Sequence, residues 1–295
     1  MNTTRAVVLA RGLGTRMREP DPAARLSDGQ RRAADAGTKP MIPVHGRPFL
    51  DYVLSALADA GMSDVALIVA PDHDGIREHY AASPPARVGL SFLVQPEPRG
   101  TANAVLSAEA WTGGASFLAM NADNLYPLPA LEALQGLAEP GLPAFEREDL
   151  ARSGNIPPER VLAFAFVEVD EEGYLTGIVE KPRVLPSEAD LPPKGGNYRV
   201  SNERVSNESP VVSAFRRKDL VSMNLWRFDA RIFDACRDVP RSARGEFELP
   251  EAVALALRRG VKFRAIPARG PVFDLSRRAD AALVERRLAG VAPRP

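Results

Sequence analysis

Residues 6–17 read AVVLARGLGTRM, an apolar run that ends in a glycine-rich, basic loop. The run predicts a buried strand over 5–10. The loop predicts a site for an anionic group, because glycines let backbone N–H groups approach a phosphate closely. It matches neither common phosphate motif: Met17 takes the place of the third glycine of the dinucleotide-binding fingerprint, and no Gly-Lys-Ser/Thr run follows. The stretch therefore indicates an α/β protein with a phosphate loop of another kind.

The composition excludes several classes of protein. The chain has 295 residues, of which 38 are basic and 38 acidic, so we expect no nucleic-acid and no membrane-surface partner. Cys236 is the only cysteine, which excludes a disulfide framework and a thiolate zinc cluster. Neither a signal segment nor an apolar run of about eighteen residues is present. We expect a soluble, cytoplasmic protein.

Strand-like and helix-like patterns alternate through the first half of the chain. After the first strand, they predict a helix at 48–61, strands at 64–70 and 88–95, a helix at 100–111 and a strand at 115–123. Such alternation is typical of a parallel sheet covered by helices on both faces.

The second half has a different pattern. It predicts a hairpin at 161–182 with its turn at 170–173, a strand at 220–228, a helix at 249–260, a strand pair within 261–275 and a helix at 278–290. Residues 183–210 are rich in Pro, Gly, Ser and Asn and predict a mobile surface excursion. Since no linker composition appears, we expect one domain over 1–295 with an inserted hairpin region.

Several short motifs occur in a specific order. They are LARGLGTRM (9–17), KPMIPVHGRPFLDYVL (39–54), QPEPRGTANAV (95–105), NADN (121–124), VEKP (179–182) and EFELPEAV (246–253) followed by VFDLS (272–276). Together they resemble the sugar-1-phosphate nucleotidyltransferases of the thymidylyl- and uridylyltransferase type. The resemblance implies transfer of a nucleotidyl group from a nucleoside triphosphate to a sugar-1-phosphate, with release of pyrophosphate and dependence on Mg²⁺.

The same resemblance implies a fold and a division of the chain. The fold is a Rossmann-like mixed, mostly parallel sheet flanked by helices, with the inserted hairpin. A nucleotide-binding part would cover about 1–125, a sugar-binding part about 126–275 and a C-terminal helix about 276–290. The family also implies self-association into a homo-oligomer.

The residues of the first loop suit a triphosphate. Gly12 and Gly14 lack Cβ atoms, and Arg16 and Lys39 supply positive charge. Attack on the α-phosphorus needs mainly alignment and charge neutralisation. The resemblance assigns Lys39 to the charge that develops around the α-phosphate and pyrophosphate, and it adds Ala10 and Thr15 to the nucleotide site.

Gln95 ends a predicted strand, where α/β proteins place ligand contacts. Its amide offers a donor and an acceptor, which match O4 and N3–H of uracil or thymine. In the family, a glutamine here with the following Gly100 and Thr101 favours UMP or dTMP transfer. The alternative is a glutamine that faces water.

Asp123 and Asp274 also follow or end predicted strands, and carboxylates there suit Mg²⁺. The resemblance implies that this pair binds the metal, although an aspartate after a strand is often a cap or turn former. The segment around Asp274 departs from the family, which usually has Trp-x-Asp-x-Gly-Thr, and Asp280 is a candidate for the acid that commonly follows.

Glu180 and Lys181 match the family residues that bind the sugar hydroxyls and the sugar phosphate, and Asn197 is a further candidate contact. Arg11 departs from the family, which usually has Gly or Ala there. These departures leave two alternatives open: transfer to a non-sugar phosphate such as phosphocholine, and a catalytically silent nucleotide-sugar-binding regulatory subunit. The presence of Lys39 favours an enzyme. No hexapeptide repeat precedes Pro295, so we expect no appended acyltransferase domain.

Overall fold

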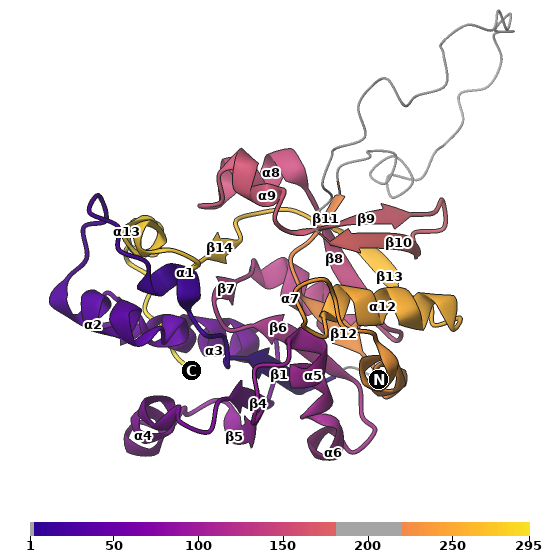
Figure 1. Ribbon diagram of the computed structural model, residues 1–295, viewed down its shortest axis with the longest axis horizontal. Helices are drawn as coiled ribbons and strands as arrows, with labels where there is room; N and C mark the ends of the chain where they lie inside the picture. Colours follow the sequence, from indigo (N-terminus) through magenta and orange to yellow (C-terminus); the bar gives the residue numbers. More distant parts are fainter. Residues whose placement is uncertain (1–2, 181–219) are drawn as a thin grey trace, which may run out of the picture.

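The computed structural model describes residues 3–180 and 220–295, without the side chain of Glu180. A ten-stranded mixed sheet forms its centre, in the order β10-β9-β11-β8-β12-β6-β1-β4-β5, with β13 paired to β8 (Figure 1). The strands are β1 (Arg5–Leu9), β4 (Asp64–Val69), β5 (Gly89–Val94), β6 (Phe117–Asn121), β8 (Gly141–Glu146), β9 (Ala165–Val169), β10 (Leu175–Glu180), β11 (Leu220–Ser222), β12 (Trp226–Phe228) and β13 (Arg264–Ala268). Two small sheets pair β2 (Pro43–Val44) with β3 (Arg47–Pro48), and β7 (Asn124–Leu125) with β14 (Phe273–Asp274).

Most strands of the central sheet run in one direction. Parallel ladders join β1 to β4 and β6, β4 to β5, and β8 to β13. The ladders made by β10, β11 and β12 are antiparallel. Followed from strand to strand, seven of the ten strands share a direction and three oppose it. The predicted mixed, mostly parallel sheet is confirmed.

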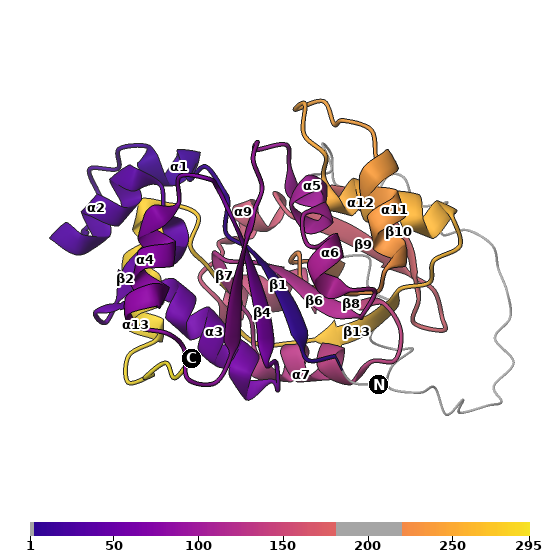
Figure 2. The ribbon, with the colours of Figure 1, turned by 90° about the horizontal axis from the view of Figure 1, so that it is seen from below.

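Helices cover both faces of the sheet, and the chain forms two hydrophobic cores. The helices are α1 (Thr15–Arg18), α2 (Asp28–Ala36), α3 (Phe49–Asp59), α4 (Asp74–Ala82), α5 (Thr101–Leu106), α6 (Glu109–Thr112), α7 (Leu128–Gly136), α8 (Arg147–Ser153), α9 (Pro158–Val161), α11 (Arg231–Asp238), α12 (Leu249–Arg258) and α13 (Arg278–Arg287). Ala6 and Val8 of β1 enter the core that α3, α4, α7 and α13 complete, whereas Val7 enters the core of α5, α11 and α12. Figure 2 shows α3 and α7 on one side of the strands and α5, α11 and α12 on the other. The apolar run of β1 is therefore buried on both faces, as in parallel sheets generally.

Three predicted elements differ in the structure. The helix expected at 100–111 is divided into α5 and α6. The strand expected at 220–228 is two strands, because Asn224 has a φ of 61° and turns the chain between β11 and β12. The expected strand pair at 261–275 was wrong: β13 joins β8 and β14 joins β7, since Gly270, with a φ of 105°, turns the chain between them.

The predicted hairpin is present as β9 and β10, with Gly173 at a φ of 84° in the turn, although its expected first residue belongs to α9. Helices α2, α4, α7, α8 and α11 and strand β8 were not predicted. The excursion expected at 183–210 lies outside the described residues. Within the described ranges, every helix is too short or too polar to cross a membrane.

Candidate active site

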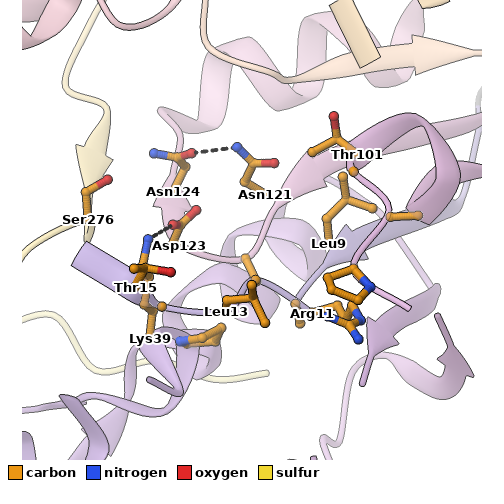
Figure 3. A pocket seen from close by; sticks show the side chains of 18 of the residues that line it. Leu9, Arg11, Leu13, Thr15, Lys39, Thr101, Asn121, Asp123, Asn124 and Ser276 are labelled. Carbon is orange, nitrogen blue, oxygen red and sulfur yellow. Dashed lines mark hydrogen bonds and ion pairs between the residues drawn. The ribbon is translucent and has the colours of Figure 1, made fainter. Parts of the chain in front are cut away.

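A cavity of about 410 Å³ lies at the carboxyl ends of β1, β5 and β6 (Figure 3). Loops after parallel strands meet at this edge of a sheet, so residues distant in sequence converge there. All eleven predicted site residues whose side chains are described line it: Ala10, Gly12, Gly14, Thr15, Arg16, Lys39, Gln95, Gly100, Thr101, Asp123 and Asp274. Glu180 ends β10, and its backbone pairs with Ala165. Lys181 and Asn197 lie outside the described residues.

The two glycines of the first loop have different roles. Gly14 has a φ of 64°, and a Cβ there would overlap the backbone of Gly37 at the end of α2. A Cβ on Gly12 would meet no protein atom within 4 Å. Gly14 is therefore required by the packing of the loop on α2, and its approach to a phosphate stays a prediction. Gly12 leaves backbone open toward the cavity.

Three charged side chains face the phosphate loop. Lys39 begins a short 3₁₀ helix, Lys39–Met41, and its Nζ lies 3.0 Å from Oδ2 of Asp123. Figure 3 shows the two side chains directed at each other. Arg16, on α1, is exposed and forms no hydrogen bond or ion pair with the residues that the structure describes. Lys39, which is paired with Asp123, and Arg16 thus both border the cavity beside this loop.

Asp274 is buried on β14 and lines the same cavity. Its Oδ1 accepts hydrogen bonds from Nδ2 of Asn124 at 3.0 Å and Oγ of Ser276 at 3.1 Å. Its Oδ2 accepts no hydrogen bond from the residues that the structure describes and lies 3.0 Å from Nη2 of Arg160. Burial first, and then the charge of Asp123, raise the pKa of Asp274 to about 6, against the opposing effect of the Arg160 charge.

The donor set fits Mg²⁺. This ion is usually held by one or two carboxylates together with substrate phosphates and water. Asp123 and Asp274 line the same cavity, and Oδ2 of Asp274 is a buried oxygen to which no described residue donates a hydrogen bond. The described ranges contain no cluster of three or more acidic, His or Cys side chains suited to a metal. Asp280 has a structural position instead, because its Oδ2 accepts the backbone N–H groups of Ser276 and Arg277 at the start of α13.

Gln95 is buried directly after β5, and its amide nitrogen already donates hydrogen bonds within the chain. Nε2 donates to the Gly100 carbonyl at 3.0 Å and to Oδ1 of Asn103 at 2.9 Å. Because a carbonyl only accepts, the Gly100 contact fixes the orientation of the amide. The expectation that Gln95 donates to O4 of a pyrimidine stays a prediction: in this structure Nε2 already donates twice, and Oε1, an acceptor, is the amide atom left for a ligand.

Arg11 connects the phosphate loop to the end of β5. Its Nε donates to the Gln95 carbonyl at 3.0 Å and its Nη2 to the Pro96 carbonyl at 3.2 Å. The Arg11 side chain thus links the loops that follow β1 and β5, the two strands on either side of β4.

Gly100, which precedes α5, allows its segment to pack against the loop before α12. Its φ of 107° and ψ of 175° are reached almost only by glycine, and a Cβ would lie 2.5 Å from the Phe247 carbonyl oxygen. We expect Gly100→Ala to destabilise the protein by about 3 kcal/mol and to raise the KM for the nucleotide. Denaturant unfolding and steady-state kinetics check both effects.

The matched control is Gly114→Ala, since Gly114 also has a positive φ, 81°, but a Cβ there meets nothing within 4 Å. This variant carries the backbone strain alone and is expected to cost about 1 kcal/mol without changing KM. Equal losses of stability in the two variants would contradict the role given to the Phe247 contact.

A second cavity of about 270 Å³ adjoins the first and extends toward β9 and β11. Sequence reasoning assigned no role to several residues that line one or both cavities: Asn121, Asn124, Arg160, Phe164, Ser222, Asn224, Arg244, Glu246 and Ser276. Asn121 and Asn124 flank Asp123 in the NADN motif, so their spacing offered a signal. Arg160 offered none, because it lies in an unremarkable PPERV segment.

The chain is similar to known nucleotidyltransferases. A model of the nucleotidyl transferase family matches residues 5–271. A glucose-1-phosphate thymidylyltransferase of Streptomyces antibioticus is 26% identical over 293 residues; the match covers 96% of this chain but 65% of that protein, so the chain spans slightly less than two thirds of its length. A CMP-5′-(3-aminopropyl)phosphonate synthase of Streptomyces rubellomurinus is 33% identical over 181 residues, which cover 61% of this chain and 25% of that protein.

A solved structure has the same fold. A UDP-glucose pyrophosphorylase complexed with UDP-glucose superimposes with a TM-score of 0.68 and 16% identity, over 97% of this chain and 98% of that one. The family model alone covers most of the sequence, including β1, which precedes the phosphate loop, and β6, which precedes Asp123. The chain therefore belongs to the nucleotidyl transferase family.

Proposed function

We propose that this protein transfers a nucleotidyl group from a nucleoside triphosphate to a sugar-1-phosphate. The observation that carries the proposal is the convergence, in one cavity, of the phosphate loop, the Lys39–Asp123 pair, Gln95 and Asp274. A phosphate oxygen of the acceptor attacks the α-phosphorus, the bond from that phosphorus to the bridging oxygen breaks, and pyrophosphate leaves. The alternative of a silent regulatory subunit is disfavoured because Lys39 lies at this cavity.

The proposed roles follow from charge and position. Arg16 and Lys39 neutralise the triphosphate, and the open backbone at Gly12 lies beside it. Asp123 and Asp274 would hold Mg²⁺, which when bound neutralises phosphate oxygens and helps to align the reacting groups. Arg244, which lines both cavities and lies 2.6 Å from Glu248, is suited to the acceptor phosphate. We also propose that about 1–125 carries the nucleotide and about 126–275 the acceptor.

UTP and dTTP are the first candidates for the donor, because the similar proteins include a thymidylyltransferase and a UDP-glucose pyrophosphorylase. The geometry of Gln95 admits CTP as a second candidate. Oε1 can accept a hydrogen bond from N3–H of uracil or from the amino group of cytosine, because Nε2 already donates within the chain. The relative named as a CMP-phosphonate synthase supports the same candidate and a non-sugar acceptor.

Pyrophosphate release tests the proposal. Full-length protein is incubated with Mg²⁺ and every combination of UTP, dTTP, CTP, ATP and GTP with several sugar-1-phosphates, phosphocholine and an aminoalkyl phosphonate. We expect release with at least one pyrimidine triphosphate and its abolition by EDTA. Absence of release over the whole panel, with tight binding of a nucleotide sugar, would instead support the regulatory subunit.

A further inference from the structure

Arg160 connects two carboxylates near the proposed metal site. It lies on α9, with its side chain only 10% exposed. Nη1 donates to both carboxylate oxygens of Asp280, at 2.8 and 3.0 Å, while Nη2 lies 3.0 Å from Oδ2 of Asp274. The two contacts of Arg160 differ. The guanidinium donates hydrogen bonds to Asp280, whereas it forms an ion pair without a hydrogen bond with Asp274.

The connection between α8 and α9 also holds the backbone of Asp274. Nδ2 of Asn155 donates to the Asp274 carbonyl at 2.8 Å, and the Asp274 N–H donates to Oδ1 of Asn155 at 2.8 Å. The carboxylate is held from the other side by Asn124 and Ser276, which both donate to Oδ1. The backbone and Oδ1 of Asp274 are thus hydrogen-bonded, whereas Oδ2 is held by its ion pair with Arg160.

We propose that Arg160 is a positioning residue that holds Oδ2 of Asp274 in place for the cation bound with the triphosphate. The inference rests on the proposed function, which assigns Asp274 to the metal. Asp280 fixes the guanidinium, and the planar fork spans both carboxylates, a geometry that lysine does not reproduce. Residues that orient a metal ligand commonly change metal affinity or activity by about 10–100-fold when replaced.

The test measures Mn²⁺ binding in the absence of turnover. Mn²⁺ is titrated into full-length protein with UTP and no acceptor, and water-proton relaxation separates protein-bound ion from the Mn²⁺–UTP complex. We expect Arg160→Met to weaken Mn²⁺ binding by about tenfold or more, and Arg160→Lys to retain most of that loss. Unchanged Mn²⁺ binding in both variants would overturn the inference, because Arg160 would then have only a structural role. Tighter binding in both would also overturn it, because the charge of Arg160 would then only repel the metal ion.

The control is Arg152→Met, because Arg152 also pairs with an aspartate at 2.7 Å on neighbouring α8 but is 78% exposed. It is expected to leave Mn²⁺ affinity unchanged. Should loss of the buried cation prevent folding, Asp280→Asn weakens the anchor of Arg160 while retaining an acceptor for the start of α13, and a several-fold weaker Mn²⁺ affinity is expected. If the wild-type protein binds no Mn²⁺, the metal assignment itself is refuted. If the wild type and the variants bind Mn²⁺ equally well, only the role of Arg160 is refuted, so the two failures can be distinguished.

Discussion

Replacing Lys39 with alanine is expected to lower kcat by about 10²–10³-fold, with a smaller change in the KM for the triphosphate. Removing one preorganised group that stabilises developing charge commonly has an effect of about this size. Lys39 is 18% exposed and paired with Asp123, so its charge is held at the cavity before the nucleotide arrives. Its largest contribution is expected where charge moves onto the leaving pyrophosphate. Steady-state pyrophosphate release with the productive substrate pair measures both constants.

The control for this variant is Lys262→Ala. Lys262 is exposed and lies over the ring of Tyr174, with Nζ 5.0 Å from the ring centroid, and it lines neither cavity. Its removal is expected to leave kcat unchanged. A Lys39→Ala protein that keeps kcat within about twofold of wild type would refute the role of Lys39 in charge neutralisation.

The sequence predicted strands β1, β4, β5 and β6 and helix α3 of the first half, together with the residues that line one cavity, because both depend on local patterns. The apolar run of β1 and the amphipathic α3 follow from periodicity and from Pro48 at the helix start. Gly12, Lys39 and Asp123 follow from motifs at strand and loop ends. All three line one cavity, which is the outcome that the order of the motifs predicted.

What the sequence did not predict depends on contacts between distant segments. The packing of Gly14 on Gly37 could not be read from a glycine-rich motif, which has the same letters whether the neighbour is a phosphate or a backbone. The committed amide of Gln95 depends on Asn103 and on the Gly100 carbonyl. Arg160 meets Asp274 across 114 positions of sequence, so no spacing rule identifies the pair.

Replacing Asp123 with asparagine is expected to lower kcat by about 10³-fold and to make the remaining activity depend on higher Mg²⁺ concentrations. The reason is the loss of a carboxylate from a pair that would hold the metal, whose charge stabilisation is worth several kcal/mol. Asparagine preserves the shape of the side chain but leaves Lys39 without its anionic partner at 3.0 Å. Activity measured against Mg²⁺ concentration checks the effect. The control is Asp229→Asn, because Asp229 is 27% exposed, close to the 23% of Asp123, and pairs with Arg231 away from both cavities.

The double variant Lys39→Ala/Asp123→Asn tests whether the two residues act together. Because the side chains contact each other and face the same phosphates, their effects are expected to be non-additive, so that the double variant loses little more than Asp123→Asn alone. If the two losses multiply instead, Lys39 and Asp123 act on independent steps, and the ion pair between them is then a feature of the nucleotide-free cavity alone. A non-additive result, together with the shifted Mg²⁺ dependence, would indicate that Lys39 and the metal ion stabilise the same negative charge as it develops in the transition state.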